Sequence, residues 1–357
     1  MEKCVSNKIK VLNFIFTLLI VLYHFKTSEN YNIVFASKID KSIYDWYFIL
    51  IERIGFVAMT FFFIISGFLF YYNIDTVKDT FTKMKKRLKS LLLPYLTWTL
   101  IVIIFNVCAH RFMGVGTEVE INSIFSIVKI LFLTPIDGPL WYMLALLIFM
   151  LLSPILIKLK NKRMLSCVVY GIVLLWHILT AYRFIPSLNV LSDWWWFGNM
   201  IGYLPAYLLG SILALNCGDK ILSEKYNTKV FRVCAIVILV CILSFTFTTK
   251  LFNNIANIAF IIEVVCIWLI IPSSIFKSKP KQYVKTSFII YAMHQPILLP
   301  IVNKIVLMVI GNVSLSGYQF IVTKFVVLLL IVLITWAIQF VIQKLPKNVN
   351  LLFTGGR

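Results

Sequence analysis

Two histidines stand inside long apolar stretches of this chain. His24 closes the run 8–25, KIKVLNFIFTLLIVLYHF, and His294 lies in the run 291–296, YAMHQP. Imidazole titrates near neutral pH, so it can act as a general base or as a nucleophile. The proline two residues after His294 removes a backbone donor, which predicts a helix break and a polar pocket. The alternatives are an interfacial ring beside Tyr23 for His24 and a hydrogen-bonded structural cluster for His294.

Charged residues form two further candidate sites. Glu52 and Arg53 are neighbours inside the second apolar run, and on a helix they point about 100° apart, so they need not pair with each other. A basic loop at 73–90 would place Lys83 and Arg87 on one face if it were helical, and such a face can hold phosphate groups. The alternatives are an interfacial charged pair and plain positive-inside topology. The basic candidates are Lys83, Lys85, Lys86 and Arg87.

Membrane-length apolar segments must position these residues. Of 357 residues, 61% are hydrophobic and 13% are charged, which is too apolar for a soluble domain. We predict an all-α, polytopic transmembrane helix bundle of about ten spans, forming a single integral membrane domain over 1–357. Lysine and arginine concentrate in alternate loops, so both termini are predicted to be cytoplasmic. The spans are expected at about 9–25, 46–72, 91–109, 138–157, 164–181, 199–216, 231–248, 255–275, 286–310 and 319–343.

Several other classes of protein do not fit. The formal net charge of +20 reflects topology, with some attraction to anionic lipid, so the bilayer is the expected partner and nucleic acid is not. The seven cysteines show no C-x-x-C spacing, which predicts neither a disulfide framework nor a metal site. No P-loop, Rossmann glycine pattern, HExxH or G-x-S-x-G motif occurs.

Six stretches of the chain resemble the acyltransferase-3 family of integral membrane proteins, which transfer acyl groups, most often acetyl, to surface carbohydrates. They occur in the family's order and cover nearly the whole chain. The resemblance implies that His24 is essential for transfer and that Arg53 and His294 belong to the catalytic site. It also implies that the basic stretch from Lys83 to Arg87 holds coenzyme A. The stretches are LIVLYH, RIGFVAMTFFFIISGFLF, KKRLKSLLLPYLTW, GPLWYMLALL, YLPAYLLGSILA and SFIIYAMHQPIL.

One position departs from the family pattern. Many members carry an arginine three turns before the histidine of the first span, where this chain has Asn13. Three turns are about 16 Å along one helix face, so a cation there can meet the phosphates of the donor while the imidazole works at the acyl end. Asparagine donates a hydrogen bond but carries no charge. Either Lys10 or the basic loop replaces the arginine, or the donor is handled differently, or the chain is inactive.

The resemblance therefore implies transfer of an acyl group, expected to be acetyl, from cytoplasmic acetyl-CoA to a hydroxyl of a cell-surface or lipid-linked carbohydrate at the cell membrane. His24 is either a general base or a transient acyl carrier. Arg53 or His294 would stabilise the developing oxyanion or orient the acceptor. A transporter or flippase for a lipid-linked glycan is the alternative, with the same polar residues lining a passage. Asn13 alone favours a third reading, an inactive membrane scaffold.

Overall fold

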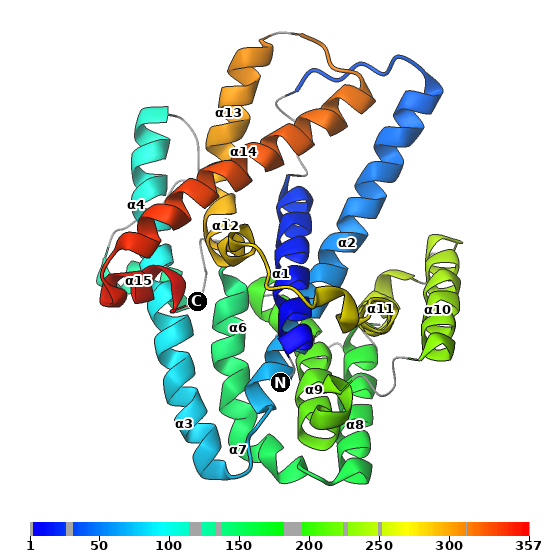
Figure 1. Cartoon of the computed structure of the whole chain (residues 1–357). Coiled ribbons are helices and arrows are strands. Elements are labelled where there is room, and N and C mark those ends of the chain that lie inside the picture. The colour runs from blue at the N-terminus through cyan, green and yellow to red at the C-terminus, as the bar shows by residue number, and fades with distance from the viewer. Residues whose placement is uncertain are drawn as a thin grey trace. The chain divides into compact units, whose positions relative to one another are not determined.

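A computed structural model of the chain describes residues 3–25, 31–113, 123–132, 138–181, 195–223, 228–248, 252–311 and 313–356 (Figure 1). Over these residues the regular structure is helical, and the sole β pairing is an isolated bridge between Ile33 and Leu315. The predicted all-α fold class is confirmed.

Six helices in the described part of the chain are long and apolar enough to cross a membrane. One of them, α14 (Gly317–Lys344), exposes Leu329, Leu333 and Trp336 along one face. Such an exposed apolar face is unfavourable in water and favourable in lipid. The chain is a multi-pass membrane protein, whereas the count of ten spans and the cytoplasmic termini stay predictions. The six helices are Lys3–His24, Lys38–Tyr71, Val77–Cys108, Trp141–Leu159, Gly198–Leu222 and Gly317–Lys344, and shorter apolar helices cover Arg163–Leu179, Ile258–Ile270 and Leu299–Ile310.

The chain divides into two compact units. Helices α1 (Lys3–His24) and α2 (Lys38–Tyr71) each contribute one part to either unit. The predicted single domain over 1–357 stays a prediction. Unit 1 comprises Met1–Leu12, Phe56–Arg87 and Ala145–Pro280, and unit 2 comprises Asn13–Gly55, Leu88–Leu144 and Lys281–Arg357.

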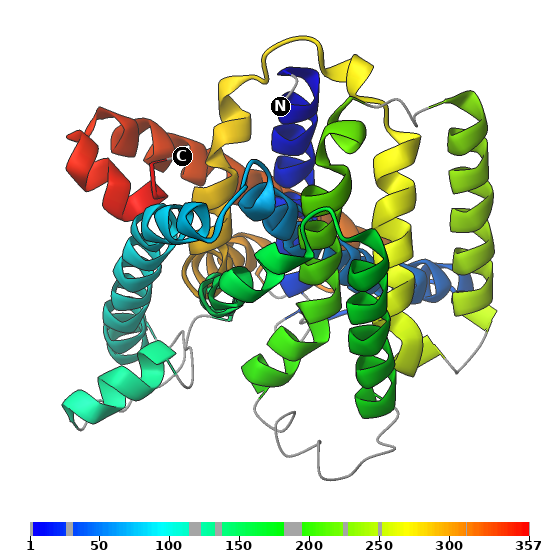
Figure 2. The ribbon, with the colours of Figure 1, turned by 90° about the horizontal axis from the view of Figure 1, so that it is seen from below.

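Close backbone packing holds unit 1 together. A Cβ atom on Gly67 of α2 would lie 2.2 Å from the carbonyl oxygen of Tyr207, and one on Gly210 would lie 1.9 Å from that of Ile64. Small residues of this kind let two helices approach closely where hydrophobic burial cannot drive them together. Helices α10 and α11 lie side by side in both views (Figures 1 and 2). The further helices of unit 1 are α3 (Val77–Arg87), α7 (Ser153–Leu156), α8 (Arg163–Ala181), α9 (Trp195–Leu222), α10 (Lys229–Thr248) and α11 (Phe252–Ile270). Helix α6 (Trp141–Phe149) begins in unit 2 and ends in unit 1.

The basic stretch predicted as a loop at 73–90 is helical over most of its length, as α3. Thr76 and Asp79 start this helix by capping each other: the Thr76 amide donates to Asp79 Oδ2 (2.8 Å) and the Asp79 amide donates to Thr76 Oγ1 (3.2 Å). The T-x-x-D spacing is a helix-start signal, and lysine is a good helix former, so polarity alone did not make this segment a loop.

Unit 2 is built around the aromatic ring of Phe320, which is fully buried on α14. This ring packs against Phe25, Tyr31, Tyr44 and Phe48, with ring centroids 5.2 to 6.4 Å away. The further elements of the unit are α4 (Leu93–Met113), α5 (Ile124–Phe132), α12 (Ser287–Met293), the π-helical turn η7 (His294–Leu298), α13 (Leu299–Ile310) and α15 (Lys347–Thr354).

The segment after α1 is fastened to the start of α14. The Val34 amide donates to Leu315 O (2.9 Å), and both Asp40 carboxylate oxygens accept from backbone amides, those of Gly317 and Tyr318, each at 2.9 Å. A carboxylate at a helix start offsets the unpaired amides and positive dipole end there. The second span was expected from residue 46, but α2 begins at Lys38. The polar residues 38–45, which were expected in a loop, form the first turns of the helix.

Candidate functional site

Unit 2 brings His24 and His294 together. His24 is the last residue of α1 and His294 the first of η7, and their ring centroids lie 5.2 Å apart with 48° between the ring planes. His294 is fully buried, and His24 is half-buried. The Tyr23 ring lies 5.1 Å from the His24 ring, so aromatic surface covers part of His24. Two imidazoles predicted separately from the sequence therefore form one site.

The hydrogen bonds of His294 define which nitrogen carries its proton. Its Nδ1 lies 2.8 Å from the carbonyl oxygen of Tyr291 and 3.1 Å from that of Ile290. Carbonyl oxygens only accept, so Nδ1 must donate, and Nε2 of the neutral ring is then an acceptor. Nε2 is buried and has no hydrogen-bond partner within the described residues. An unsatisfied buried acceptor is uncommon, and here it belongs to one of two adjacent imidazoles.

The helix break predicted around Pro296 is confirmed. Gln295 leaves the helical region with φ −138° and ψ 133°, inside η7. Helical turns of this kind occur often at functional sites, because they free backbone groups and redirect side chains. The Gln295 side-chain oxygen is buried without a partner in the part of the chain that the structure describes. It lies near Gly138, on which a Cβ atom would stand 3.7 Å away. Two consecutive side chains thus present unpaired acceptors.

Lys324 holds the end of α1 in place, and its role was not predicted from the sequence. It is almost fully buried on α14, and its ammonium donates to the carbonyl oxygen of Phe25, the residue after His24. The ammonium lies 4.2 Å from the ring centroid of Phe48 and 4.9 Å from that of Phe320. A cation favours aromatic faces and the carbonyl end of a helix. A lone charge inside the predicted tenth span was the available signal.

The position of α2 beside this site depends on Gly55. A Cβ atom there would lie 2.5 Å from the Tyr23 ring, so only glycine allows the approach. Arg53 stands two residues earlier and is buried, 6% exposed, whereas Glu52 is exposed. The two charges point in different directions, as helix geometry predicted. Arg53 is therefore an interior residue of unit 2.

Asn13 lies on α1 in unit 2, half-buried. Its backbone carbonyl accepts from the Thr17 hydroxyl (2.7 Å), and its side-chain oxygen is buried without a hydrogen-bond partner in the described ranges. Lys10, a candidate replacement for the family's arginine, is exposed in unit 1. The Asn13 side chain therefore has one unused hydrogen-bond acceptor, and unlike the family's arginine it carries no positive charge.

The basic candidates form part of unit 1. On α3, Lys83 and Arg87 are half-buried while Lys85 and Lys86 are exposed, so the two faces of the helix differ as predicted for a helical segment. The Lys83 ammonium donates to the carbonyl oxygen of Tyr72 (2.6 Å). Of the four basic side chains, Lys85 and Lys86 are the most accessible to a phosphate.

These features define a class of protein: a multi-pass helical membrane protein with two adjacent histidines, one half-buried and one fully buried. The chain belongs to the acyltransferase-3 family, whose model, described as an acyltransferase domain, matches residues 7–340. The resemblance noted in the sequence is thereby confirmed, and the protein is an acyltransferase of the membrane. All the candidate residues lie within the matched range. No curated protein and no solved structure matches this chain.

Proposed function

We propose that this protein transfers an acetyl group from acetyl-coenzyme A to a hydroxyl of a cell-surface or lipid-linked carbohydrate at the cell membrane. Membership of the family supports acyl transfer, and the donor and the acceptor are part of the proposal. The observation that carries it is the pair of His24 and His294, 5.2 Å apart, with a buried acceptor nitrogen on the second ring.

His24 acts as the general base in this proposal. Its imidazole removes the proton of the acceptor hydroxyl, whose oxygen then forms a bond to the acyl carbon as the bond to sulfur breaks. The same proton passes from His24 to the departing sulfur, so the ring returns to its starting state. Acetyl-coenzyme A supplies an acyl carbon activated by a thiol leaving group.

His294 and Arg53 assist the transfer. The Nε2 atom of His294 accepts a hydrogen bond from a hydroxyl of the carbohydrate and so orients the carbohydrate. Nδ1 cannot do this because it already donates to the backbone. Arg53 supplies positive charge for the oxygen on which negative charge develops, an effect that is strongest away from water. Its burial fits that role.

The donor's phosphates bind to the basic helix α3. Lys85 and Lys86 are exposed, and Lys83 and Arg87 line the other side of the same helix, so four cations stand within two turns. Lysine and arginine bind phosphate through charge-assisted hydrogen bonds. Asn13 contributes a hydrogen bond in place of the arginine common in the family.

The test uses the purified full chain in liposomes with labelled acetyl-coenzyme A and a panel of envelope glycans. His24→Gln should lower the transfer rate by about 10²- to 10⁴-fold, the usual contribution of a general base. His177→Gln is the matched control, because His177 is also buried in the membrane part but lies in unit 1. Full transfer by a folded His24→Gln protein contradicts the mechanism. Movement of labelled glycan across the liposome membrane in the absence of acetyl-coenzyme A would support the flippase hypothesis instead.

A further inference from the structure

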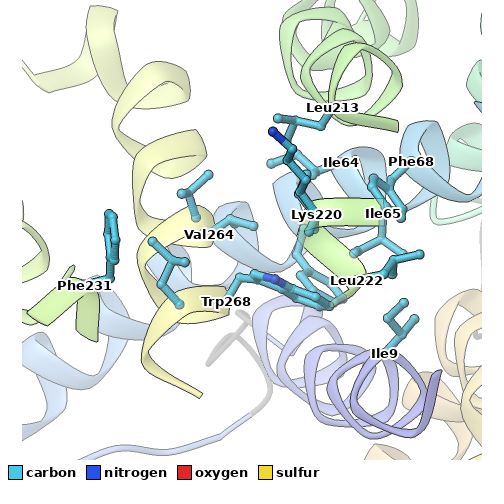
Figure 3. A pocket seen from close by; sticks show the side chains of 14 residues that line it. Ile9, Ile64, Ile65, Phe68, Leu213, Lys220, Leu222, Phe231, Val264 and Trp268 are labelled. Atoms are coloured by element: carbon cyan, nitrogen blue, oxygen red, sulfur yellow. The ribbon is translucent and has the colours of Figure 1, made fainter. Parts of the chain in front are cut away.

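Unit 1 contains an apolar pocket of about 320 Å³, and Figure 3 shows the side chains that line it. Its walls come from α1, α2, α9, α10 and α11, and Lys220 is the one charged side chain among the described residues that line it. Trp268 lies in the wall, and the buried Lys8 ammonium stands 3.8 Å from its ring centroid and donates to its carbonyl oxygen (2.8 Å). The lysine holds the indole in place. A pocket with such walls in a membrane protein suits a hydrocarbon chain.

Lys220 also lines a second pocket of about 340 Å³ in the same unit, and this one is polar. Its walls include Asn73, Asn161 and Asp219. Lys160 and Asp75 are ion-paired with each other there, so their charges offset one another. Asp219 and Lys220 are the charges left to meet a ligand. Lys220 thus stands at the border between an apolar and a polar pocket, with Asp219 on the polar side.

We propose that these two pockets bind one phospholipid whose head group carries a phosphate and an amine. The order of groups along such a lipid is chain, phosphate, ammonium. The order along the site is apolar pocket, Lys220, Asp219. The chain fills the apolar pocket, the phosphate meets the Lys220 ammonium, and the lipid's ammonium meets the Asp219 carboxylate. Neighbouring helix residues point about 100° apart, which separates the two charges as the head group requires.

The predicted topology agrees with this assignment. Lys220 belongs to a lysine-bearing loop region expected on the cytoplasmic side, where lipid head groups border the apolar core. Long basic side chains reach such a border from the end of a membrane helix. The lipid site involves neither His24 nor His294, so it is independent of the proposed acyl transfer.

The test follows the fluorescence of Trp268 in micelles of an uncharged maltoside detergent, which carries neither a phosphate nor an amine. The probes are phosphatidylethanolamine and phosphatidylglycerol, each with brominated acyl chains that quench a nearby indole. Because the chain has 9 tryptophans, the signal is the difference between the wild type and Trp268→Phe. We expect brominated phosphatidylethanolamine to quench at a lower mole fraction than brominated phosphatidylglycerol.

Substitutions separate the parts of the site. Asp219→Asn should remove the preference for the amine lipid, and Lys220→Gln should weaken both lipids by about two- to fivefold, as expected for exposed ion pairs. Lys229→Gln, an exposed lysine at the start of α10, should change neither. Val265→Phe, in the pocket wall, should reduce quenching, whereas Ile262→Phe on the same helix but outside the pocket should not.

Two outcomes would overturn the proposal. One is equal quenching by both lipids with no change in Asp219→Asn. The other is displacement of the brominated lipid by long-chain acyl-coenzyme A at concentrations below those of the lipid, which would assign the apolar pocket to the acyl donor.

Discussion

The imidazole rings of His24 and His294 lie 5.2 Å apart, although one closes the first helix and the other opens the break in a helix near the far end of the chain. The Nδ1 of His294 is tied to two backbone carbonyls, which turns its Nε2 away from the backbone as an acceptor. This pairing gives the site one half-buried ring and one fully buried ring with different tasks.

Substitutions of His294 can separate its two nitrogens. Asparagine places an amide near the position of Nδ1 and keeps the bond to the Tyr291 carbonyl, while glutamine reaches the position of Nε2. If Nε2 orients the acceptor, His294→Gln should retain more activity than His294→Asn, with the loss seen mainly in the KM for the acceptor. Transfer kinetics at varied acceptor concentration measure this. Equal activities in the two variants would mean that His294 has only a structural role.

Loss of the Lys324 ammonium should loosen the end of α1. Lys324→Met keeps much of the side-chain volume but leaves the buried Phe25 carbonyl without its donor, which should cost about 1–3 kcal/mol of unfolding free energy. Unfolding in detergent and the transfer rate both report on it. The control is Lys344→Met on the same helix, where the lysine is exposed and lies 4.3 Å from the Phe340 ring. An equal effect of the two substitutions would argue against a special role for Lys324.

A methyl group at Gly55 should push α2 away from α1. Gly55→Ala places a carbon 2.5 Å from the Tyr23 ring, and relieving that overlap should cost about 1–3 kcal/mol and lower the transfer rate. Gly171→Ala has nothing within 4 Å of the added carbon, so it should instead stabilise α8 by about 0.5–1 kcal/mol. Thermal unfolding of both variants checks the contrast, which disappears if Gly55 is merely a helical glycine.

The carboxylate of Asp40 should matter for the start of α14. Asp40→Ala removes the acceptor for the Gly317 and Tyr318 amides, and we expect a loss of about 0.5–2 kcal/mol, the range for a helix cap. Asp45→Ala, at an exposed position of the same helix, is expected to change stability little. Denaturant unfolding compares them, and similar losses would show that the two amides find another partner.

Charge reversal on α3 should act on the donor alone. Lys85→Glu and Lys86→Glu should raise the KM for acetyl-coenzyme A and leave kcat nearly unchanged, because they touch phosphates and not the reacting atoms. The effect should shrink as salt screens exposed charges. Lys78→Glu, exposed on the first turn of the same helix, is the control. If all three substitutions behave alike, α3 acts through general surface charge and holds no phosphate.

Local signals in the sequence were enough for several features. The apolar runs indicated membrane helices because burial in lipid depends on composition and length. Pro296 indicated the break in the helix because its ring removes a backbone donor wherever it stands. The spacing of Thr76 and Asp79 also indicates a helix start, and the prediction of a loop at 73–90 did not take it into account.

What the tertiary structure alone decided are contacts between residues far apart in the chain. Nothing in the periodicity of the first span or the ninth span states that His24 meets His294, that Lys324 caps the end of α1, or that Lys220 borders two pockets of opposite character. Helical periodicity fixes which residues share a face of one helix, but it leaves open which helix covers that face. That choice rests on close packing, such as the fit of Gly55 against Tyr23, and packing is a property of the folded chain.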